Sequence, residues 1–130
     1  MPQPPLIACI DDDASVREAL EGLLVAFGFA AEIFASAEDF LSSARLDRIS
    51  CLIADVKLAG MSGLQLQRRL VESGYQIPTI LITAFGDDRL RRQALDAGAV
   101  NLLLKPIARE DLLSSIELAL KRKADGDDGQ

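Results

Sequence analysis

Short apolar runs alternate with longer amphipathic stretches along the chain, and this alternation restricts the fold more than any other feature of the sequence. A short apolar run between turn residues predicts a strand, whereas apolar residues at intervals of three and four predict a helix. The predicted strands comprise residues 6–10, 31–34, 51–55, 79–83 and 101–104. All but the second are nearly continuous apolar runs, which is typical of strands covered on both faces of a parallel sheet.

A helix is predicted after each of these strands. Gly28, Gly74 and Gly98 follow three of the helical stretches, where a glycine commonly ends a helix. Ser36, with Asp39 three residues later, predicts the beginning of the second helix. The helical stretches comprise residues 16–27, 36–44, 64–71, 87–97 and 112–120. Five successive strand–helix units predict an α/β fold, a doubly wound five-stranded parallel sheet between two helical layers.

The length and composition predict a single domain. The chain has 130 residues, of which 49% are hydrophobic and 26% are charged, and one domain typically has ~100–200 residues. We expect an N-terminal extension at residues 1–5 and the folded domain at residues 6–123. Residues 124–130 contain three Asp and two Gly, and this composition predicts a disordered acidic tail.

The charge and the missing residue types exclude several functions. Lys and Arg total 14 against 20 Asp and Glu, so the net charge of −6 argues against a nucleic-acid-binding surface. The sequence lacks a membrane-spanning run and a signal peptide, which predicts a cytoplasmic protein. It contains no His, so a His base or His metal ligand is excluded. Cys9 and Cys51 lie inside apolar runs and are predicted to be inert core thiols.

Polar residues follow four of the five predicted strands. They are Asp11, Asp12 and Asp13 after the first, Asp55 at the third, Thr83 at the fourth, and Lys105 and Pro106 after the fifth. The carboxyl ends of parallel strands lie along one edge of a sheet, where ligands bind. Two carboxylates about 5 Å apart repel by on the order of 3 kcal/mol at an effective dielectric of ~20. Lys105 can offset part of that repulsion, and an oxygen-ligated Mg²⁺ or Mn²⁺ can offset the rest.

Each of these residues also has an ordinary structural explanation. Asp13 can cap the next helix, Asp55 can be a turn residue, and a Lys-Pro pair is common. Their joint position at the carboxyl ends of four strands favours a functional site over separate structural roles.

The sequence resembles the receiver domain of bacterial two-component response regulators over residues 6 to about 121. The motifs are Asp11-Asp12, Asp55, Gly60-Met61-Ser62-Gly63-Leu64, Thr83-Ala84, Ala97-Gly98-Ala99 and Lys105-Pro106. The FixJ-type branch is the most similar, through Asp13, Ser15-Val16-Arg17, Ser36-Ala37-Glu38, Gln67-Arg68-Arg69-Leu70 and Gly86-Asp87. The resemblance implies a flavodoxin-like (βα)5 fold with strand order 2-1-3-4-5.

The resemblance also implies roles for the strand-end residues. Asp55 would accept a phosphoryl group from a histidine kinase or a phosphotransfer protein. Asp12 and Asp55 would bind Mg²⁺ directly and Asp11 through water, with the backbone carbonyl of Lys57 as a further ligand. Thr83 and Lys105 would contact the phosphoryl oxygens, and the Lys105–Pro106 bond would be cis. Such a protein catalyses only its own phosphorylation and dephosphorylation, so we do not expect an enzyme acting on other substrates.

Several positions depart from the family pattern or vary within it. Lys57 and Phe85 occupy positions that tune phosphoryl hydrolysis in receivers, although a solvated Lys and a half-exposed packing Phe would explain them equally well. Leu102 replaces the aromatic residue that usually moves inward on activation, which puts the usual coupling to Thr83 in doubt. Ala59 stands where receivers commonly have Pro.

The leading prediction is a single-domain switch whose output face, formed by the fourth helix, fifth strand and fifth helix, binds a downstream protein or forms a homodimer. One alternative is the regulatory part of a FixJ-type transcription factor, and another is a degenerate receiver that takes no phosphate. An Mg²⁺-dependent phosphatase would require Asp at position 57, which is Lys. A flavin carrier would require a phosphate-binding loop where Asp11, Asp12 and Asp13 would repel phosphate.

Overall fold

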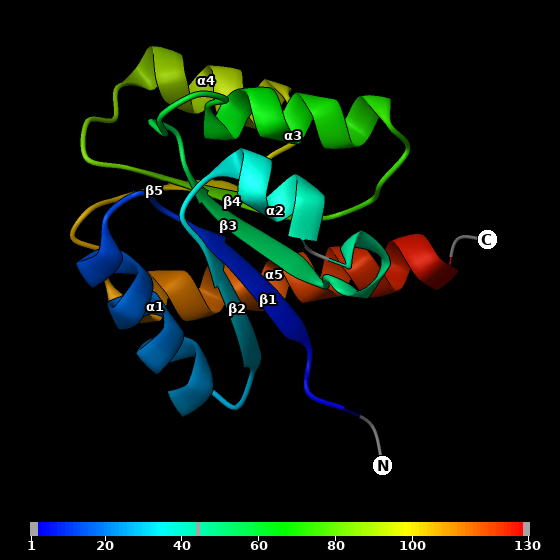
Figure 1. Cartoon of the computed structure of the whole chain (residues 1–130). Helices are drawn as coiled ribbons and strands as arrows, with labels where there is room; N and C mark the ends of the chain where they lie inside the picture. Colours follow the sequence, from blue (N-terminus) through cyan, green and yellow to red (C-terminus); the bar gives the residue numbers. More distant parts are fainter. Residues whose placement is uncertain (1–2, 44, 129–130) are drawn as a thin grey trace.

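Five parallel strands form the centre of the molecule (Figure 1). The computed structural model describes residues 3–43 and 45–128 of the chain. The strands are β1 (Leu6–Ile10), β2 (Ala30–Phe34), β3 (Cys51–Asp55), β4 (Thr79–Thr83) and β5 (Asn101–Leu104). Their order is β2-β1-β3-β4-β5, so the predicted doubly wound, flavodoxin-like fold is confirmed.

Helices cover both faces of the sheet. They are α1 (Ala14–Ala26), α2 (Ala37–Ser43), α3 (Gly63–Glu72), α4 (Asp88–Asp96) and α5 (Arg109–Asp128). Helices α1 and α5 lie on one face, and α2, α3 and α4 lie on the other (Figure 1). Successive residues of a strand point to opposite faces, so Ala8 and Ile10 of β1 join one core while Ile7 and Cys9 join the other. This two-sided burial explains why the strand sequences are continuously apolar.

The register of the strands brings their carboxyl ends level. Ile10 pairs with Ala54 of the neighbouring strand, and Thr83 pairs with Leu104. Asp55 pairs with Ile82, one residue before the end of β4. The polar residues at these strand ends therefore lie together at one edge of the sheet, and an apolar core lies on each face of the sheet.

Side-chain caps fix where the helices begin after this edge. The carboxylate of Asp13 accepts a hydrogen bond from the backbone of Ser15 at 2.9 Å, and that of Asp87 accepts one from Leu90 at 2.7 Å. Ser36 accepts a hydrogen bond from the backbone of Asp39 at 3.0 Å, as its spacing predicted. These side chains satisfy backbone N–H groups in the first turns of α1, α2 and α4 and so mark where the three helices begin.

Two features were not predicted from the sequence. A single 3₁₀ turn, Leu46–Arg48, lies immediately before the strand β3. The last helix continues to Asp128, although residues 124–130 were expected to be disordered; residues 129–130 lie outside the described residues. Extending an existing helix fixes one residue for each new hydrogen bond, so a long helix can continue over residues that would not start one. Within the described residues, none of the helices has the length and apolar character needed to cross a membrane.

The two cysteines are predicted to be unreactive in the folded protein. Cys9 and Cys51 are fully buried in the core, and burial raises the pKa of Cys9 to about 12 and also raises that of Cys51. Since the thiolate is the reactive species, we expect no adduct after brief treatment with iodoacetamide at neutral pH. The same treatment in denaturant should add two groups, as measured by intact-protein mass. An adduct on the folded protein would contradict the core position of these thiols.

Candidate functional site

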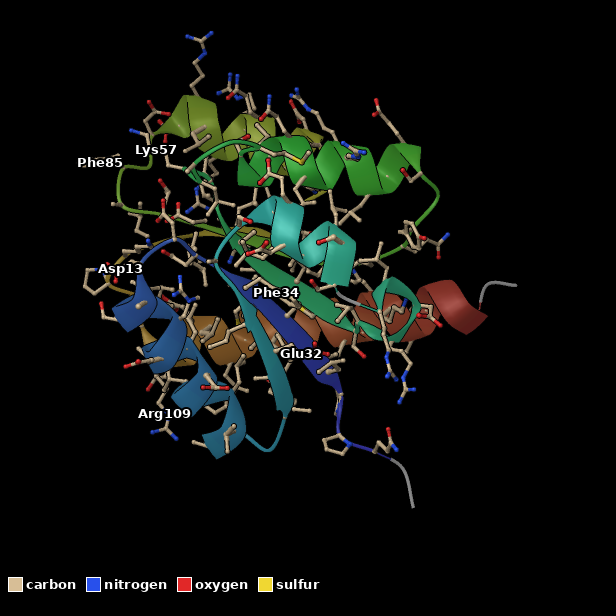
Figure 2. The ribbon with its side chains drawn as sticks, viewed as in Figure 1. Asp13, Glu32, Phe34, Lys57, Phe85 and Arg109 are labelled. Carbon is tan, nitrogen blue, oxygen red and sulfur yellow. The ribbon has the colours of Figure 1, made fainter. Side chains whose placement is uncertain are left out.

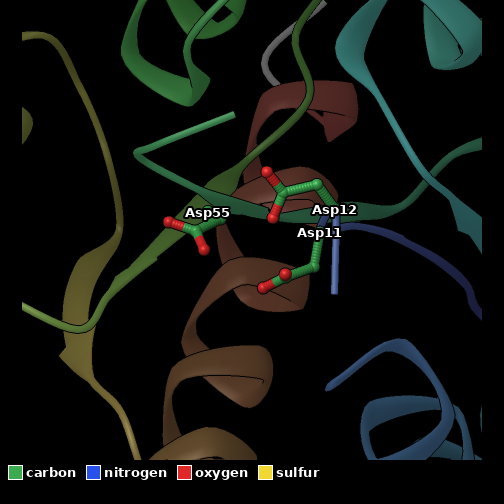
Figure 3. A group of neighbouring side chains, drawn as sticks. All are labelled: Asp11, Asp12 and Asp55. Atoms are coloured by element: carbon green, nitrogen blue, oxygen red, sulfur yellow. The ribbon is translucent and has the colours of Figure 1, made fainter. Parts of the chain in front are cut away.

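Three carboxylates meet at the carboxyl ends of β1 and β3 (Figure 3). Asp11 and Asp12 follow β1, and Asp55 is the last residue of β3. One oxygen from each lies within 4.8 Å of the others. Asp11 is fully buried and Asp55 is 7% exposed, whereas Asp12 is exposed to solvent. The acidic cluster predicted from the sequence is therefore present, and two of its three members are largely shielded from water.

Lys105 supplies the positive charge that faces this cluster. Its Nζ atom lies 2.8 Å from Oδ2 of Asp11 and 2.6 Å from Oδ2 of Asp55. Burial by itself lowers the pKa of Lys105, but the two carboxylates outweigh burial and raise the pKa above its usual value. Burial raises the pKa of Asp55, and the charge of Asp11 adds to this rise, while Lys105 opposes it. Lys105 thus opposes the effect of burial on the pKa of Asp55 but does not outweigh it.

Backbone N–H groups orient the two buried carboxylates. Oδ1 of Asp55 accepts a hydrogen bond from the backbone of Lys57 at 2.9 Å, and Oδ1 of Asp11 accepts one from Asp13 at 2.9 Å. Nη1 of Arg17 donates to the backbone carbonyl of Asp11 at 2.7 Å. Because the backbone holds one oxygen of each side chain, the other oxygen faces Lys105.

The donor set fits a small divalent cation. Within the described part of the chain, Oδ2 of Asp11 is buried, and the group that contacts it is the ammonium group of Lys105. The one positive charge of Lys105 faces both buried carboxylates and offsets only one of their two negative charges, and Asp12 adds a third beside them. Hard oxygen ligands of this kind are the ones that Mg²⁺ prefers.

The helix α3 begins directly against the backbone of Asp55. Gly63 donates its N–H to the carbonyl of Val56 at 3.1 Å. A Cβ atom at Gly63 would lie 2.3 Å from the carbonyl oxygen of Asp55, a distance that no side chain could adopt without moving the backbone. The absence of a side chain at this position therefore permits the close contact between β3 and α3.

Thr83 and Lys105–Pro106 also lie where the sequence predicted them. Thr83 is almost fully buried at the end of β4, and its hydroxyl accepts a hydrogen bond from the backbone N–H of Phe85 at 3.2 Å. The Lys105–Pro106 peptide bond is cis, as expected from the resemblance.

Lys57 and Phe85 contact each other at the same end of the molecule (Figure 2). The Nζ atom of Lys57 lies 5.4 Å from the centre of the Phe85 ring, within the range of a cation–π contact. Phe85 is 77% exposed, so its ring is not packed into the core. The two predicted tuning residues are therefore paired, an arrangement that their separate positions in the sequence did not indicate.

Leu102 is part of the core rather than of this edge. Its side chain is 2% exposed, and its carbonyl accepts a hydrogen bond from Nη2 of Arg91 at 3.2 Å. Arg91 thus attaches α4 to β5 at Leu102, the residue that replaces the aromatic residue usual at this position. Leu104, two residues later, is half exposed.

The model of the response regulator receiver domain family matches residues 7–117. The chain therefore belongs to the receiver-domain family of two-component response regulators. Members of this family bind Mg²⁺ at an acidic pocket and interact with histidine kinases.

Individual relatives agree with this assignment. The response regulator protein TodT from Pseudomonas putida is 44% identical over 116 residues, which cover 89% of this chain and 51% of TodT. The transcriptional regulatory protein FixJ from Bradyrhizobium diazoefficiens is 34% identical over 116 residues, which cover 89% of this chain and 57% of FixJ. This chain thus spans about half the length of the curated relatives it matches.

Solved structures show the same architecture. The response regulator StyR is 39% identical and superposes with a TM-score of 0.89, covering 97% of this chain and 64% of StyR. The crystal structure of FixJ-N is 34% identical and has a TM-score of 0.81, covering 92% of this chain and 96% of FixJ-N.

Proposed function

We propose that this chain is a cytoplasmic, phosphorylation-gated switch in which Asp55 accepts a phosphoryl group from a histidine kinase or a phosphotransfer protein. The observation that supports this most is the position of Lys105, which contacts both Asp11 and Asp55 beside the exposed Asp12. The buried free thiols agree with a reducing compartment. The phosphatase alternative lacks its general acid, because position 57 is Lys.

The proposed reaction is a transfer between two side chains. A carboxylate oxygen of Asp55 attacks phosphorus, a P–O bond forms, and the P–N bond of the donor phosphohistidine breaks; the departing imidazole ring takes up one proton from solvent. Lys105 stabilises the negative charge on the transferred group, and the hydroxyl of Thr83 donates a hydrogen bond to it. Asp11, Asp12, Asp55 and the carbonyl of Lys57 would hold Mg²⁺, which when bound neutralises charge on the phosphoryl oxygens. The chain catalyses its own phosphorylation and hydrolysis and acts on no other substrate.

We propose that the kinase or phosphotransfer protein docks in an apolar groove beside Lys105. The groove has a volume of about 560 Å³ and lies between α1 and the segment that follows β5. Its lining includes Val16, Leu20 and Leu23 from α1, and Pro106 and Ile107 from the segment after β5. A helix of the phosphodonor protein seated here would place its histidine next to Asp55.

We propose that the face formed by α4, β5 and α5 transmits the signal by binding a downstream protein or a second copy of this chain. Leu104 is half exposed on this face and can contribute apolar contact area. The name of FixJ, a transcriptional regulatory protein, favours the regulatory part of a transcription factor over a single-domain switch. An immunoblot of the source cells would distinguish the two, since only the single-domain switch would migrate as a protein of this chain's length.

The phosphoryl-accepting function can be tested by intact-protein mass spectrometry after incubation with acetyl phosphate. We expect one added phosphoryl group in the presence of Mg²⁺ and none when the metal is removed with a chelator. A folded protein that forms no adduct with acetyl phosphate or with a phosphorylated kinase would contradict the proposal and would support the degenerate receiver.

Replacing Asp12 is predicted to weaken metal binding. Asp12→Asn removes one negative charge from the cluster without changing the volume of the side chain, so the Mg²⁺ dissociation constant should rise by roughly tenfold or more. The matched control is Asp13→Asn, which removes the same charge from a neighbour that caps α1. Isothermal titration calorimetry measures both constants. An equal affinity for the two variants would contradict the assignment of Asp12 as a ligand.

A further inference from the structure

Several contacts attach the loop between β3 and α3 to the molecule, including the N–H of Val56, which donates to the carbonyl of Ile82 at 2.8 Å, and the buried side chain of Leu58. Near its beginning, the backbone of Lys57 donates to Asp55, and at its end Gly63 donates to Val56. A further attachment comes from a different element: Oε2 of Glu38, in the first turn of α2, accepts a hydrogen bond from the backbone of Met61 at 3.0 Å. This bond holds the backbone of the loop beyond the buried Leu58.

The local structure is shaped around this attachment. Gly60 has a φ of +80°, and a Cβ atom there would lie 2.8 Å from Oε2 of Glu38. A side chain at position 60 would thus push the carboxylate away from Met61. The Met61 side chain packs against the core on the α2 side of the sheet. The backbone N–H of Met61 also lowers the pKa of Glu38, because it stabilises the charged carboxylate.

We infer that Glu38 is a positioning residue for the phosphoacceptor site. By holding Met61, it fixes the loop that carries the backbone carbonyl of Lys57, a proposed metal ligand. This inference rests on the proposed function. Leu58 anchors the loop in the core, but Ala59 and Gly60 are exposed and the segment contains no Pro, so the bond from Glu38 restrains the exposed part of the loop. Ordering a free loop at the moment of metal binding costs conformational entropy. A carboxylate that orders the loop beforehand removes that cost and strengthens metal binding.

A competing explanation is that Glu38 only stabilises α2. Acidic side chains in the first turn of a helix interact favourably with its macrodipole, and Asp39 is a second acidic residue in the same turn. Both side chains are exposed, so neither supports the core. Within the described residues, the side chain of Glu38 bonds the loop, whereas the hydrogen bonds of Asp39 involve its backbone N–H and carbonyl. Asp39 is therefore a matched control for the helix effect.

The test compares Glu38→Ala and Glu38→Gln with Asp39→Ala in the full chain. The Mg²⁺ dissociation constant is measured by calorimetry, the exchange of the Met61 amide by NMR, and the unfolding midpoint in urea. Loss of an outer-shell partner typically weakens metal binding by about 10–100-fold, and Glu38 acts one step further from the metal. We therefore expect about threefold to tenfold weaker binding for Glu38→Ala, a smaller loss for Glu38→Gln, and no loss for Asp39→Ala.

The Met61 amide should exchange faster in Glu38→Ala than in Asp39→Ala, with similar unfolding midpoints for the two variants. Equal Mg²⁺ affinity in Glu38→Ala and Asp39→Ala would overturn the inference while leaving the proposed function intact. If the unaltered chain bound no Mg²⁺ and took no phosphoryl group, the proposed function would be wrong, and the role of Glu38 in it would be wrong as well.

Discussion

Asp55→Asn is expected to abolish the phosphoryl adduct entirely while leaving the fold intact. The amide of Asn is not a nucleophile toward phosphorus, Asp11 is buried against Lys105, and Asp12 is a proposed metal ligand. The substitution keeps the size of the side chain, and the amide oxygen can still accept the hydrogen bond from Lys57. It also removes one of the like charges that face each other in the cluster. Losing the contact with Lys105 is offset by this relief, so we expect the free energy of unfolding to change by about 1 kcal/mol or less.

Intact-protein mass after treatment with acetyl phosphate and Mg²⁺ measures the adduct, and urea unfolding measures the stability. Asp47→Asn is a suitable control, because Asp47 is an exposed residue of the 3₁₀ turn before β3. This control should accept one phosphoryl group, as the unaltered chain does. An adduct on Asp55→Asn would show that another carboxylate is the acceptor.

Lys105→Met should have the second-largest effect, on both stability and phosphoryl transfer. Lys105 is the ammonium group that contacts the buried Asp11 and Asp55, at 2.8 and 2.6 Å. Removing one partner of a buried ion pair leaves a charge without compensation, which typically costs 3–5 kcal/mol. The side chain of Lys105 is 21% exposed, so water screens part of this interaction. We therefore expect a loss of about 2–4 kcal/mol.

Added Mg²⁺ should increase the stability of Lys105→Met more than that of the unaltered chain. Mg²⁺ can supply the missing positive charge, so added Mg²⁺ should restore part of the lost stability. Phosphoryl transfer should slow by about a hundredfold, since the charge that develops on the phosphoryl oxygens loses a preorganised partner. Lys121→Met changes the same charge on an exposed part of α5 and serves as the control. Unchanged stability and an unchanged transfer rate in Lys105→Met would contradict the charge-balancing role.

Much of the fold could be predicted because the strands are buried on both faces. An apolar run that ends in a polar residue marks the end of such a strand clearly, and the predicted bounds of β1, β3, β4 and β5 match those in the structure. The second strand lies at the edge of the sheet, where its residues are only partly buried, and its predicted beginning is one residue late. The length of α5 could not be predicted, because its last residues are polar and lack an apolar stripe.

The candidate site could be predicted only as far as the strand ends determine it. The meeting of Asp11, Asp12, Asp55 and Lys105 follows from parallel strands in register. The contact between Glu38 and Met61 does not, because an exposed Glu near the beginning of a helix has the same sequence signature whether or not it contacts a loop. The pairing of Lys57 with Phe85 likewise joins two loops whose conformations the sequence pattern does not specify.

The residues of the candidate site are far apart in the sequence, so the site forms only in molecules whose whole sheet is folded. Lys105 follows the last strand, whereas its partner Asp11 follows the first, and Asp55 comes from the third. Under the proposed function, a chain still emerging from the ribosome, or one whose sheet has opened, lacks at least one of these groups in place and cannot accept a phosphoryl group from a kinase. The phosphorylated population would then contain only completely folded molecules, so the strength of the signal would follow the amount of intact protein rather than the total amount synthesised.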